Sequence, residues 1–262
     1  MSTPLLELRN VSKSFRRGSR PVDALQDVSL HLDRGETLAI VGPSGSGKST
    51  LARIVMRLVE PDRGQIRFDG IDLASTQGEA LRKLRPRFQM VFQDPLAAFN
   101  PRATVARALD DPLRIHGLVG RAKRPGAIAA LLDRVGLDPT LAGRRIHEVS
   151  GGQRQRIAIA RAIATKPALI VLDEAVSALD VTVRAGVLAL LDELRRNDKL
   201  SYLFISHDLA VVSSFAERIA VMDAGRIVET GTAAAVIAAP QSATGKALVA
   251  ATPKLKTGES RP

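Results

Sequence analysis

The chain has 262 residues, of which 45% are hydrophobic and 25% charged, values that are ordinary for a folded globular protein and argue against bulk disorder. Cysteine is absent, which excludes disulfides, thiolate metal sites and cysteine-bound iron–sulfur clusters. The 38 Lys and Arg residues outnumber the 27 Asp and Glu residues, and the net charge of +11 favours either an anionic partner or a basic solvated surface.

The N-terminus lacks a basic stretch followed by an apolar one, so no secretory signal is readable. The longest apolar runs, such as residues 168–172, fall far short of the ~20 residues that a membrane-spanning helix needs. Aromatic residues make up only 3% and tryptophan is absent, which argues against a base-stacking surface for single-stranded nucleic acid. We therefore expect a soluble or peripheral protein with no nucleic-acid partner.

In chain order, residues 5–9 and 36–41 have the composition of strands, and the second leads into a glycine-rich loop. Residues 48–60 carry apolar side chains at helical spacing, and a strand at 65–70 follows. From about residue 94 to 150 the chain is rich in alanine and arginine. That composition predicts an α-helical subdomain inserted into an α/β core.

The core resumes at residues 168–174 with an unbroken apolar run, typical of a strand buried on both faces of a parallel sheet. A helix at 183–196, a strand at 201–206, a further helix and a hairpin at 218–230 follow. This alternation predicts a doubly wound α/β sheet. We expect one domain over residues 1–240 and a loosely held Pro-, Ala- and Lys-rich tail at 241–262.

The first candidate site is the loop GPSGSGKST, which fits the pattern G-x-x-x-x-G-K-[ST] between a strand and a helix. Backbone N–H groups of such a loop surround a phosphate, and the helix N-terminus adds partial positive charge. Lys48 is expected to reach the β- and γ-phosphates of a nucleotide, and the Ser49 hydroxyl to ligate Mg²⁺. The residues expected to bind the nucleotide are Gly42, Pro43, Ser44, Gly45, Ser46, Gly47, Lys48, Ser49 and Thr50.

Polar residues at the ends of three predicted strands complete this site. Asp173 follows the apolar run 168–172 and is the natural second anchor for Mg²⁺. Glu174 is placed to orient the water that attacks the γ-phosphate. Gln93 and His207 end two other strands, and we expect both to lie near the same phosphate.

A second glycine-bearing loop, SGGQ at residues 150–153, also precedes a helix and so offers an anion site, but no lysine follows its glycines. One phosphate cannot easily be held by both loops of the same chain. Two chains arranged head to tail would place the first loop of one opposite the second loop of the other, with ATP between them. The sequence therefore predicts a protein that works in pairs.

Together these segments resemble the nucleotide-binding subunits of ATP-binding-cassette (ABC) transporters over residues 5–230. GPSGSGKST looks like their Walker A motif, Gln93 the Q-loop, VSGGQ the signature, ALIVLDE the Walker B motif, SALD the D-loop and His207 the switch histidine. The resemblance implies a P-loop NTPase core with a mainly parallel sheet, an N-terminal antiparallel β element and the inserted helical subdomain. Val149 and Ala175 replace the usual leucine and proline but remove no functional group, so we expect ATPase activity.

The resemblance also assigns roles and implies ATP and Mg²⁺ as cofactors. Glu174, His207 and Gln93 would be catalytic, and Phe15 would stack on adenine. Mg²⁺ would be held by Ser49, Gln93 and Asp173. The residues that would contact ATP bound to the opposite chain are Ser150, Gly151, Gly152, Gln153 and Asp180.

Residues 90–102, 173–191 and 243–255 are most similar to the dipeptide, oligopeptide and nickel importer branch, the second range especially to nickel-importer subunits. That branch implies a second, distinct ATPase subunit, two transmembrane permease subunits and, indirectly, a solute-binding protein, at the cytoplasmic face of the inner membrane. The solute is not readable from this chain. The alternative is a non-transport ABC ATPase acting in cluster assembly or nucleic-acid maintenance.

The segment DPLAAFNPR after Gln93 leads from the nucleotide site into the helical subdomain. Its apolar residues Leu96 and Phe99 lie in a turn-rich stretch, and we expect them to be exposed and to dock a permease helix. The alternative is that both side chains pack inside the helical subdomain.

Overall fold

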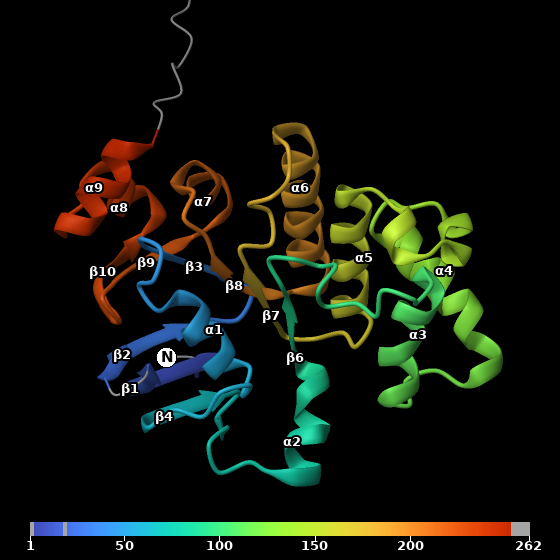
Figure 1. Ribbon diagram of the computed structural model, residues 1–262, viewed down its shortest axis with the longest axis horizontal. Helices are drawn as coiled ribbons and strands as arrows, with labels where there is room; N and C mark the ends of the chain where they lie inside the picture. The colour runs from blue at the N-terminus through green and yellow to red at the C-terminus, as the bar shows by residue number, and fades with distance from the viewer. Residues whose placement is uncertain (1–2, 18–19, 253–262) are drawn as a thin grey trace, which may run out of the picture.

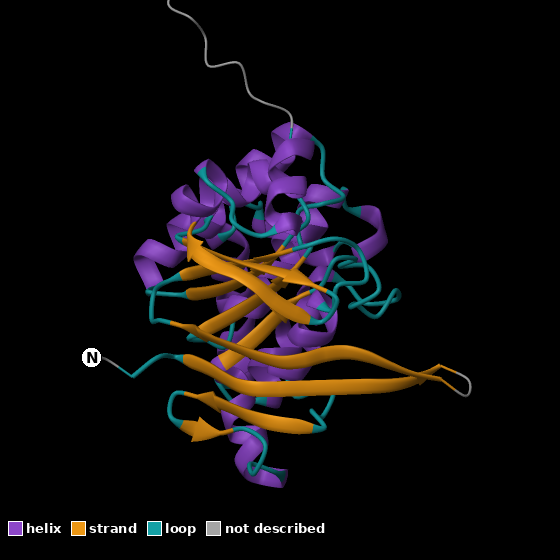
Figure 2. Ribbon diagram, turned by 90° about the vertical axis from the view of Figure 1, so that its left-hand side faces the viewer, coloured by secondary structure: helices purple, strands orange, loops and turns teal. Residues whose placement is uncertain are grey.

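The structure, a computed structural model, describes residues 3–17 and 20–252. In Figure 2 the smaller of two sheets lies below the larger one, and most of the helices lie above. Neighbouring strands of the larger sheet are parallel, except for an antiparallel hairpin at one edge. Its order is β10 (Arg226–Thr232), β9 (Arg218–Asp223), β3 (Thr37–Val41), β8 (Ser201–Ile205), β7 (Leu169–Asp173) and β6 (Phe88–Val91).

The smaller sheet is antiparallel, in the order β2 (Arg20–Leu32), β1 (Leu6–Arg17), β4 (Arg63–Phe68) and β5 (Ile71–Asp72). The sequence predicts only the first part of β1 and misses β2. Register shifts between Leu8 and Ser14 break the alternation of apolar and polar residues that would have revealed the longer strand. The two strands are stabilised by pairing with each other, a non-local contact that a short sequence window does not contain.

The three central strands β3, β7 and β8 are buried at every position, as their apolar runs predict. Alternate residues of these strands point to opposite faces of the sheet. One face packs against α1 and the smaller sheet, through Leu38, Ile40, Leu169, Val171, Leu203 and Ile205. The other packs against the large helices, through Ala39, Val41, Ile170, Leu172 and Phe204. The predicted α/β core is confirmed.

The helices fall into three groups (Figure 1). Those of the core are α1 (Lys48–Val55), α2 (Gly78–Leu84), α5 (Gly151–Ile163), α6 (Val181–Asp198) and α7 (Leu209–Phe215). Between β6 and α5 lie α3 (Val105–Ile115) and α4 (Arg124–Arg134), which form the helical subdomain. The last two helices are α8 (Ala233–Ala238) and α9 (Ala243–Ala251).

Short 3₁₀ turns connect these elements: η1 (Arg85–Arg87), η2 (Arg121–Lys123), η3 (Pro139–Gly143) and η4 (Ile146–Glu148). Within the described ranges, no helix has both the length and the apolar character needed to cross a membrane.

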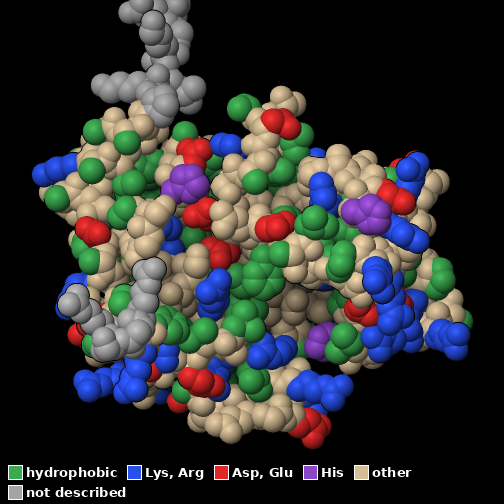
Figure 3. Space-filling model, in the orientation of Figure 1, with side chains coloured by type: hydrophobic (Ala, Val, Ile, Leu, Met, Phe, Trp, Pro, Cys, Tyr) green, Lys and Arg blue, Asp and Glu red, His purple; other side chains and the backbone are tan. Residues whose placement is uncertain are grey.

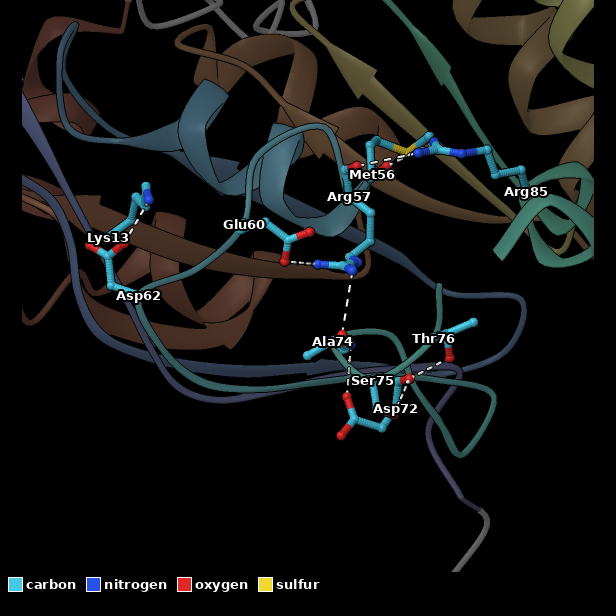
Figure 4. A network of polar contacts seen from close by, with 10 residues as sticks. All are labelled: Lys13, Met56, Arg57, Glu60, Asp62, Asp72, Ala74, Ser75, Thr76 and Arg85. Atoms are coloured by element: carbon cyan, nitrogen blue, oxygen red, sulfur yellow. Dashed lines mark hydrogen bonds and ion pairs between the residues drawn. The ribbon is translucent and has the colours of Figure 1, made fainter. Parts of the chain in front are cut away.

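Helix α1 ends at Val55 instead of continuing to residue 60 as its spacing predicts. Arg57 has a left-handed backbone (φ 52°), which cannot continue a right-handed helix. Arg85 donates to the carbonyl oxygens of Met56 (3.2 Å) and Arg57 (3.3 Å), so the helix end is bound by a guanidinium from η1 (Figure 4). Arg57 itself pairs with Glu60 and donates to the Ala74 carbonyl in the loop before α2.

The chain from residue 241 to 252 is not the loosely held tail that its composition suggests. It forms α9, whose N-cap Ser242 accepts a hydrogen bond from the Gly245 amide (2.9 Å). Leu248 and Val249 pack partly against the larger core. The predicted tail therefore contains an ordered helix at its start, and residues 253–262 lie outside the described residues.

Candidate functional site

The phosphate-type loop joins β3 to α1 and closes around its own lysine. Gly47 caps the helix with φ 107°, a conformation that L side chains rarely adopt. The Lys48 ammonium donates to the carbonyl oxygens of Gly42 and Pro43, both at 2.8 Å, and to the Ser46 hydroxyl at 3.4 Å. Burial lowers the pKa of Lys48, while the nearby carboxylates of Glu174 and Asp173 oppose that shift. The loop thus holds a cation at the N-terminus of a helix.

Asp173 lies across from this loop at the carboxyl end of β7. Its Oδ1 accepts a hydrogen bond from the Ser49 hydroxyl at 3.2 Å, and the residue is buried. Burial raises the pKa of Asp173, although the hydrogen bond from Ser49 works in the opposite direction. Serine and aspartate oxygens this close together form a donor set suited to a hard divalent cation such as Mg²⁺.

Glu174, Gln93 and His207 meet at the ends of three neighbouring strands, as their positions in the sequence predict. Gln93 Nε2 donates to Glu174 Oε2 at 2.8 Å, and His207 Nδ1 lies 3.4 Å from Glu174 Oε1. Glu174 has a left-handed backbone (φ 48°), a strained conformation fixed by hydrogen bonds from its amide to Ile205 O (3.0 Å) and from Ser177 Oγ to its carbonyl (2.9 Å). Both oxygens of one carboxylate are therefore directed by side chains from adjacent strands.

The SGGQ loop lies at the start of α5, and its polar side chains cap that helix. Ser150 Oγ accepts from the Gln153 amide (3.2 Å), and Gln153 Oε1 accepts from the Ser150 amide (2.9 Å). Gly152 lies against α6, since an added Cβ would stand 2.6 Å from Val183 Cγ1. Asp180 caps α6 by accepting from the Val183 amide at 2.9 Å. The two segments expected to reach a partner's nucleotide are thus packed on each other.

Among the described residues no hydrogen bond joins residues 150–153 to residues 42–50. The same residues contain no group of three or more His, Cys, Asp or Glu side chains placed to hold a metal. The Ser49–Asp173 pair offers two oxygen atoms, so a Mg²⁺ ion bound there would need further ligands from water or from a phosphate-bearing molecule.

Residues 25–177 match the family model described as ABC transporter, a span that includes the phosphate loop, Gln93, the SGGQ loop and Glu174. The chain belongs to the ABC transporter family.

Curated relatives of this cassette include the glutathione import ATP-binding proteins of Shigella flexneri serotype 5b and Escherichia coli strain K12. Each is 46% identical over 266 residues, which covers 99% of the cassette and 43% of the relative. The cassette thus spans less than half the length of these proteins. The resemblance of residues 90–102, 173–191 and 243–255 predicted an importer of the dipeptide, oligopeptide and nickel branch, closest to nickel-importer subunits; these relatives are named for glutathione import and not for nickel.

Solved structures confirm the fold. The ATP-binding cassette MJ0796, a dimer in a post-hydrolysis state with ADP and Pi, is 31% identical with a TM-score of 0.80, covering 87% of this cassette and 98% of that chain. The protein cbiO1 from Clostridium perfringens, part of the ABC transporter complex cbiONQ, is 25% identical with a TM-score of 0.80, covering 91% of this cassette and 92% of that chain.

Phe15 lies on β1 opposite Val22, and 42% of its surface is exposed. The Lys13 ammonium lies 5.5 Å from the centre of its ring. An exposed ring beside a cation is able to stack on a base, so its place in the adenine site stays a prediction that this geometry permits.

The prediction that Phe99 is exposed is wrong. Its side chain is buried (6% exposed), and the Arg161 guanidinium from α5 lies 4.5 Å from the ring centre. Arg161 also donates to the Ala98 carbonyl at 2.8 Å, so a cation–π contact and a hydrogen bond fix this turn inside the helical subdomain. Leu96 is 36% exposed and remains at the surface.

Sequence reasoning missed the pair formed by Arg184 and Asp208. Arg184 donates to Asp208 Oδ2 at 2.9 Å and to the Leu179 carbonyl at 3.0 Å. It therefore joins the residue after His207 to the SALD segment. Asp208, directly after His207, was the only signal in the sequence for this pair. Its partner Arg184 lies on α6, and no local pattern indicates that the two residues meet.

Proposed function

We propose that this cassette binds and hydrolyses ATP as one subunit of an importer, and that turnover drives uptake of a small peptide through a membrane permease. The observation that carries the proposal is the convergence of Lys48, Asp173 and Glu174 at one edge of the sheet. The relatives named for glutathione import, a tripeptide, match 99% of the cassette and favour a peptide over nickel and transport over a soluble ATPase.

Phosphate binding would use groups that the loop already orients. The Lys48 ammonium donates to three oxygens of its own loop, and a phosphate oxygen is a stronger acceptor than these neutral oxygens. Because Lys48 is buried, its interaction with phosphate is poorly screened by water. The amide groups at the start of α1 add donors and the positive end of the helix dipole.

Ser49, Asp173 and Gln93 would hold Mg²⁺, which supplies positive charge against the β- and γ-phosphates. Asp173 would serve as its carboxylate ligand. Since burial and the neighbouring Glu174 carboxylate raise the pKa of Asp173, a nearby positive charge would favour the ionised carboxylate that binding requires.

Glu174 would orient and deprotonate the attacking water. Gln93 and His207 contact different oxygens of its carboxylate, so the two side chains control its direction. When Gln93 turns from Glu174 towards the nucleotide, Oε2 becomes free to accept a hydrogen bond from water. His207, which contacts Oε1, would donate a hydrogen bond to the γ-phosphate.

The complete site would need a second cassette. The SGGQ loop presents the N-terminus of α5, with Gly151 and Gly152 exposing backbone amides next to the Asp180 segment. In a head-to-tail pair these groups would close over ATP held by the partner's phosphate loop. The dimeric structure of the cassette MJ0796 supports pairing of two cassettes. The partner of this chain in an importer would be a distinct ATPase subunit.

Docking to the two permease subunits would use a groove between α2 and the end of α3. Its volume is about 350 Å³, and its lining includes the exposed apolar residues Ile115 (50%) and Leu118 (44%). Arg82 also lines the groove, as do Glu79 and Lys83, which pair with each other at 2.8 Å. An amphipathic cytoplasmic helix with an acidic residue opposite Arg82 fits this lining. Docking there would place the cassette peripherally at the cytoplasmic face of the membrane, with the solute-binding protein acting only through the permease.

The test is to purify the cassette from membranes of its native host with a mild detergent and to identify the proteins that accompany it. The proposal expects two polytopic membrane proteins and a second cassette, with ATPase activity that rises when the solute-binding protein is added. Recovery of the active ATPase only as a soluble complex without membrane proteins would refute the importer role and favour the soluble alternative.

A further inference from the structure

Helix α9 is held by the β9–β10 hairpin, beside which it lies in Figure 1. The Glu229 carboxylate on β10 accepts from the Gln241 amide (2.9 Å), the Ser242 amide (2.9 Å) and the Ser242 hydroxyl (2.6 Å). Thr244, in the first turn of α9, donates its hydroxyl to Asp223 Oδ2 at 2.6 Å. Two carboxylates of one hairpin therefore fix the start of the last described helix.

The turn of the same hairpin supports the phosphate loop. Asp223 is the last residue of β9, and the turn passes through Ala224 (φ 41°) and Gly225 (φ 80°). The Gly225 amide donates to the Ser46 carbonyl at 3.0 Å. Met222 contacts the loop too, since an added Cβ at Gly47 would stand 2.9 Å from Met222 Cε.

The turn is also bonded on its other side. Gln26 of β2 donates its amide to the Gly225 carbonyl (2.8 Å) and its side chain to the Ala224 carbonyl (3.2 Å). The turn thus lies between the smaller sheet and the phosphate loop, and its position decides where Ser46 lies. Because Ser46 also accepts from Lys48 (3.4 Å), a shift of the turn would reach the lysine expected to hold phosphate.

We propose that Thr244 is a positioning residue for the ATP site, acting through Asp223 and the Ala224–Gly225 turn on the phosphate loop. The inference rests on the proposed ATP binding. It gives the segment ATGKALVAA a role in the nucleotide site, although this segment lies far along the chain from the phosphate loop. The Thr244 hydroxyl holds the Asp223 carboxylate, Asp223 pairs with Arg226 on the two sides of the turn, and the Gly225 amide donates to the Ser46 carbonyl. Helix α9 thereby preorganises the loop for phosphate.

The test measures the dissociation constant of ATP with Mg²⁺ by calorimetry, using the whole 262-residue chain. Thr244→Val keeps the shape of the side chain and removes its hydroxyl, and we expect binding to weaken about three- to tenfold. Thr244→Ser retains a hydroxyl and should restore the affinity to near that of the wild type. Thr252→Val is the matched control, because it removes a hydroxyl bonded to the Leu248 carbonyl (2.9 Å) at the other end of α9.

A double-mutant cycle separates this role from simple loosening of α9. In an Asp223→Ala background, Thr244→Val should have no further effect on ATP affinity, because the connection is already broken. The proposal would be overturned if Thr244→Val weakened ATP binding equally in the wild type and in Asp223→Ala. It would also be overturned if Thr244→Val changed the affinity no more than Thr252→Val does. A wild-type chain that binds no ATP would instead refute the proposed function, so the two failures are distinguishable.

Discussion

Glu174→Gln is expected to separate ATP binding from ATP hydrolysis. The glutamine side chain has the shape of the glutamate side chain, and its amide oxygen can still accept a hydrogen bond from Gln93. The contact at 2.8 Å can therefore be kept without the negative charge. It cannot take a proton from water. Loss of a positioned general base lowers turnover by about 10²- to 10⁴-fold, which corresponds to about 3–5 kcal/mol of transition-state free energy.

The same substitution should leave ATP affinity unchanged or slightly increased. The Glu174 carboxylate lies close enough to Asp173 to help raise the pKa of that residue, so its negative charge would also act on phosphates bound beside Asp173. Removing that charge reduces repulsion of the phosphates. The assay compares single-turnover phosphate release and ATP binding in the wild type, Glu174→Gln and the control Glu193→Gln, an exposed residue on α6. Hydrolysis by Glu174→Gln within about tenfold of the wild-type rate would refute the assigned role.

Lys48→Ala should weaken ATP binding at least about tenfold by removing the buried cation of the loop, and calorimetry with unchanged affinity would count against that contact. Phe99→Ala should destabilise the chain by about 3–5 kcal/mol in chemical denaturation because the ring is buried under Arg161, whereas an unaltered midpoint would contradict that packing. Asp173→Asn should raise the melting temperature at pH 7. Burial raises the pKa of Asp173, so the charged carboxylate destabilises the folded state above that pKa. The difference in melting temperature should vanish below about pH 4, where the carboxyl group is protonated in both the folded and the unfolded chain.

The sequence predicts the site better than it predicts the surroundings of the site. Asp173, Glu174 and His207 follow apolar strands whose burial on both faces is a local property of composition, and parallel strands bring such ends together without further information. The position of Phe99 depended on Arg161, which comes from a different helix and covers the ring. The helix at the start of the predicted tail depends similarly on Glu229, whose carboxylate accepts from the Ser242 amide. Nothing in residues 241–252 indicates this partner on β10.

The packing of the SGGQ loop against α6 is likewise only partly predictable from the sequence. The capping box of Ser150 and Gln153 is a local pattern and could be predicted from SGGQ itself. The contact of Gly152 with Val183 requires α5 and α6 to be neighbours, and that depends on how both helices pack on the sheet. Spacing along the chain therefore locates the chemical groups, while tertiary packing determines which of them are in contact.

The Arg184 guanidinium spans two segments that would serve different nucleotides in a head-to-tail pair. Leu179 belongs to the segment predicted to face the partner's ATP, and Asp208 follows the histidine that contacts the chain's own Glu174. A displacement of either segment is transmitted to the other by one rigid, planar group. The two ATP sites of the pair are therefore expected to hydrolyse cooperatively, with a Hill coefficient that falls towards one when Arg184 is replaced by alanine.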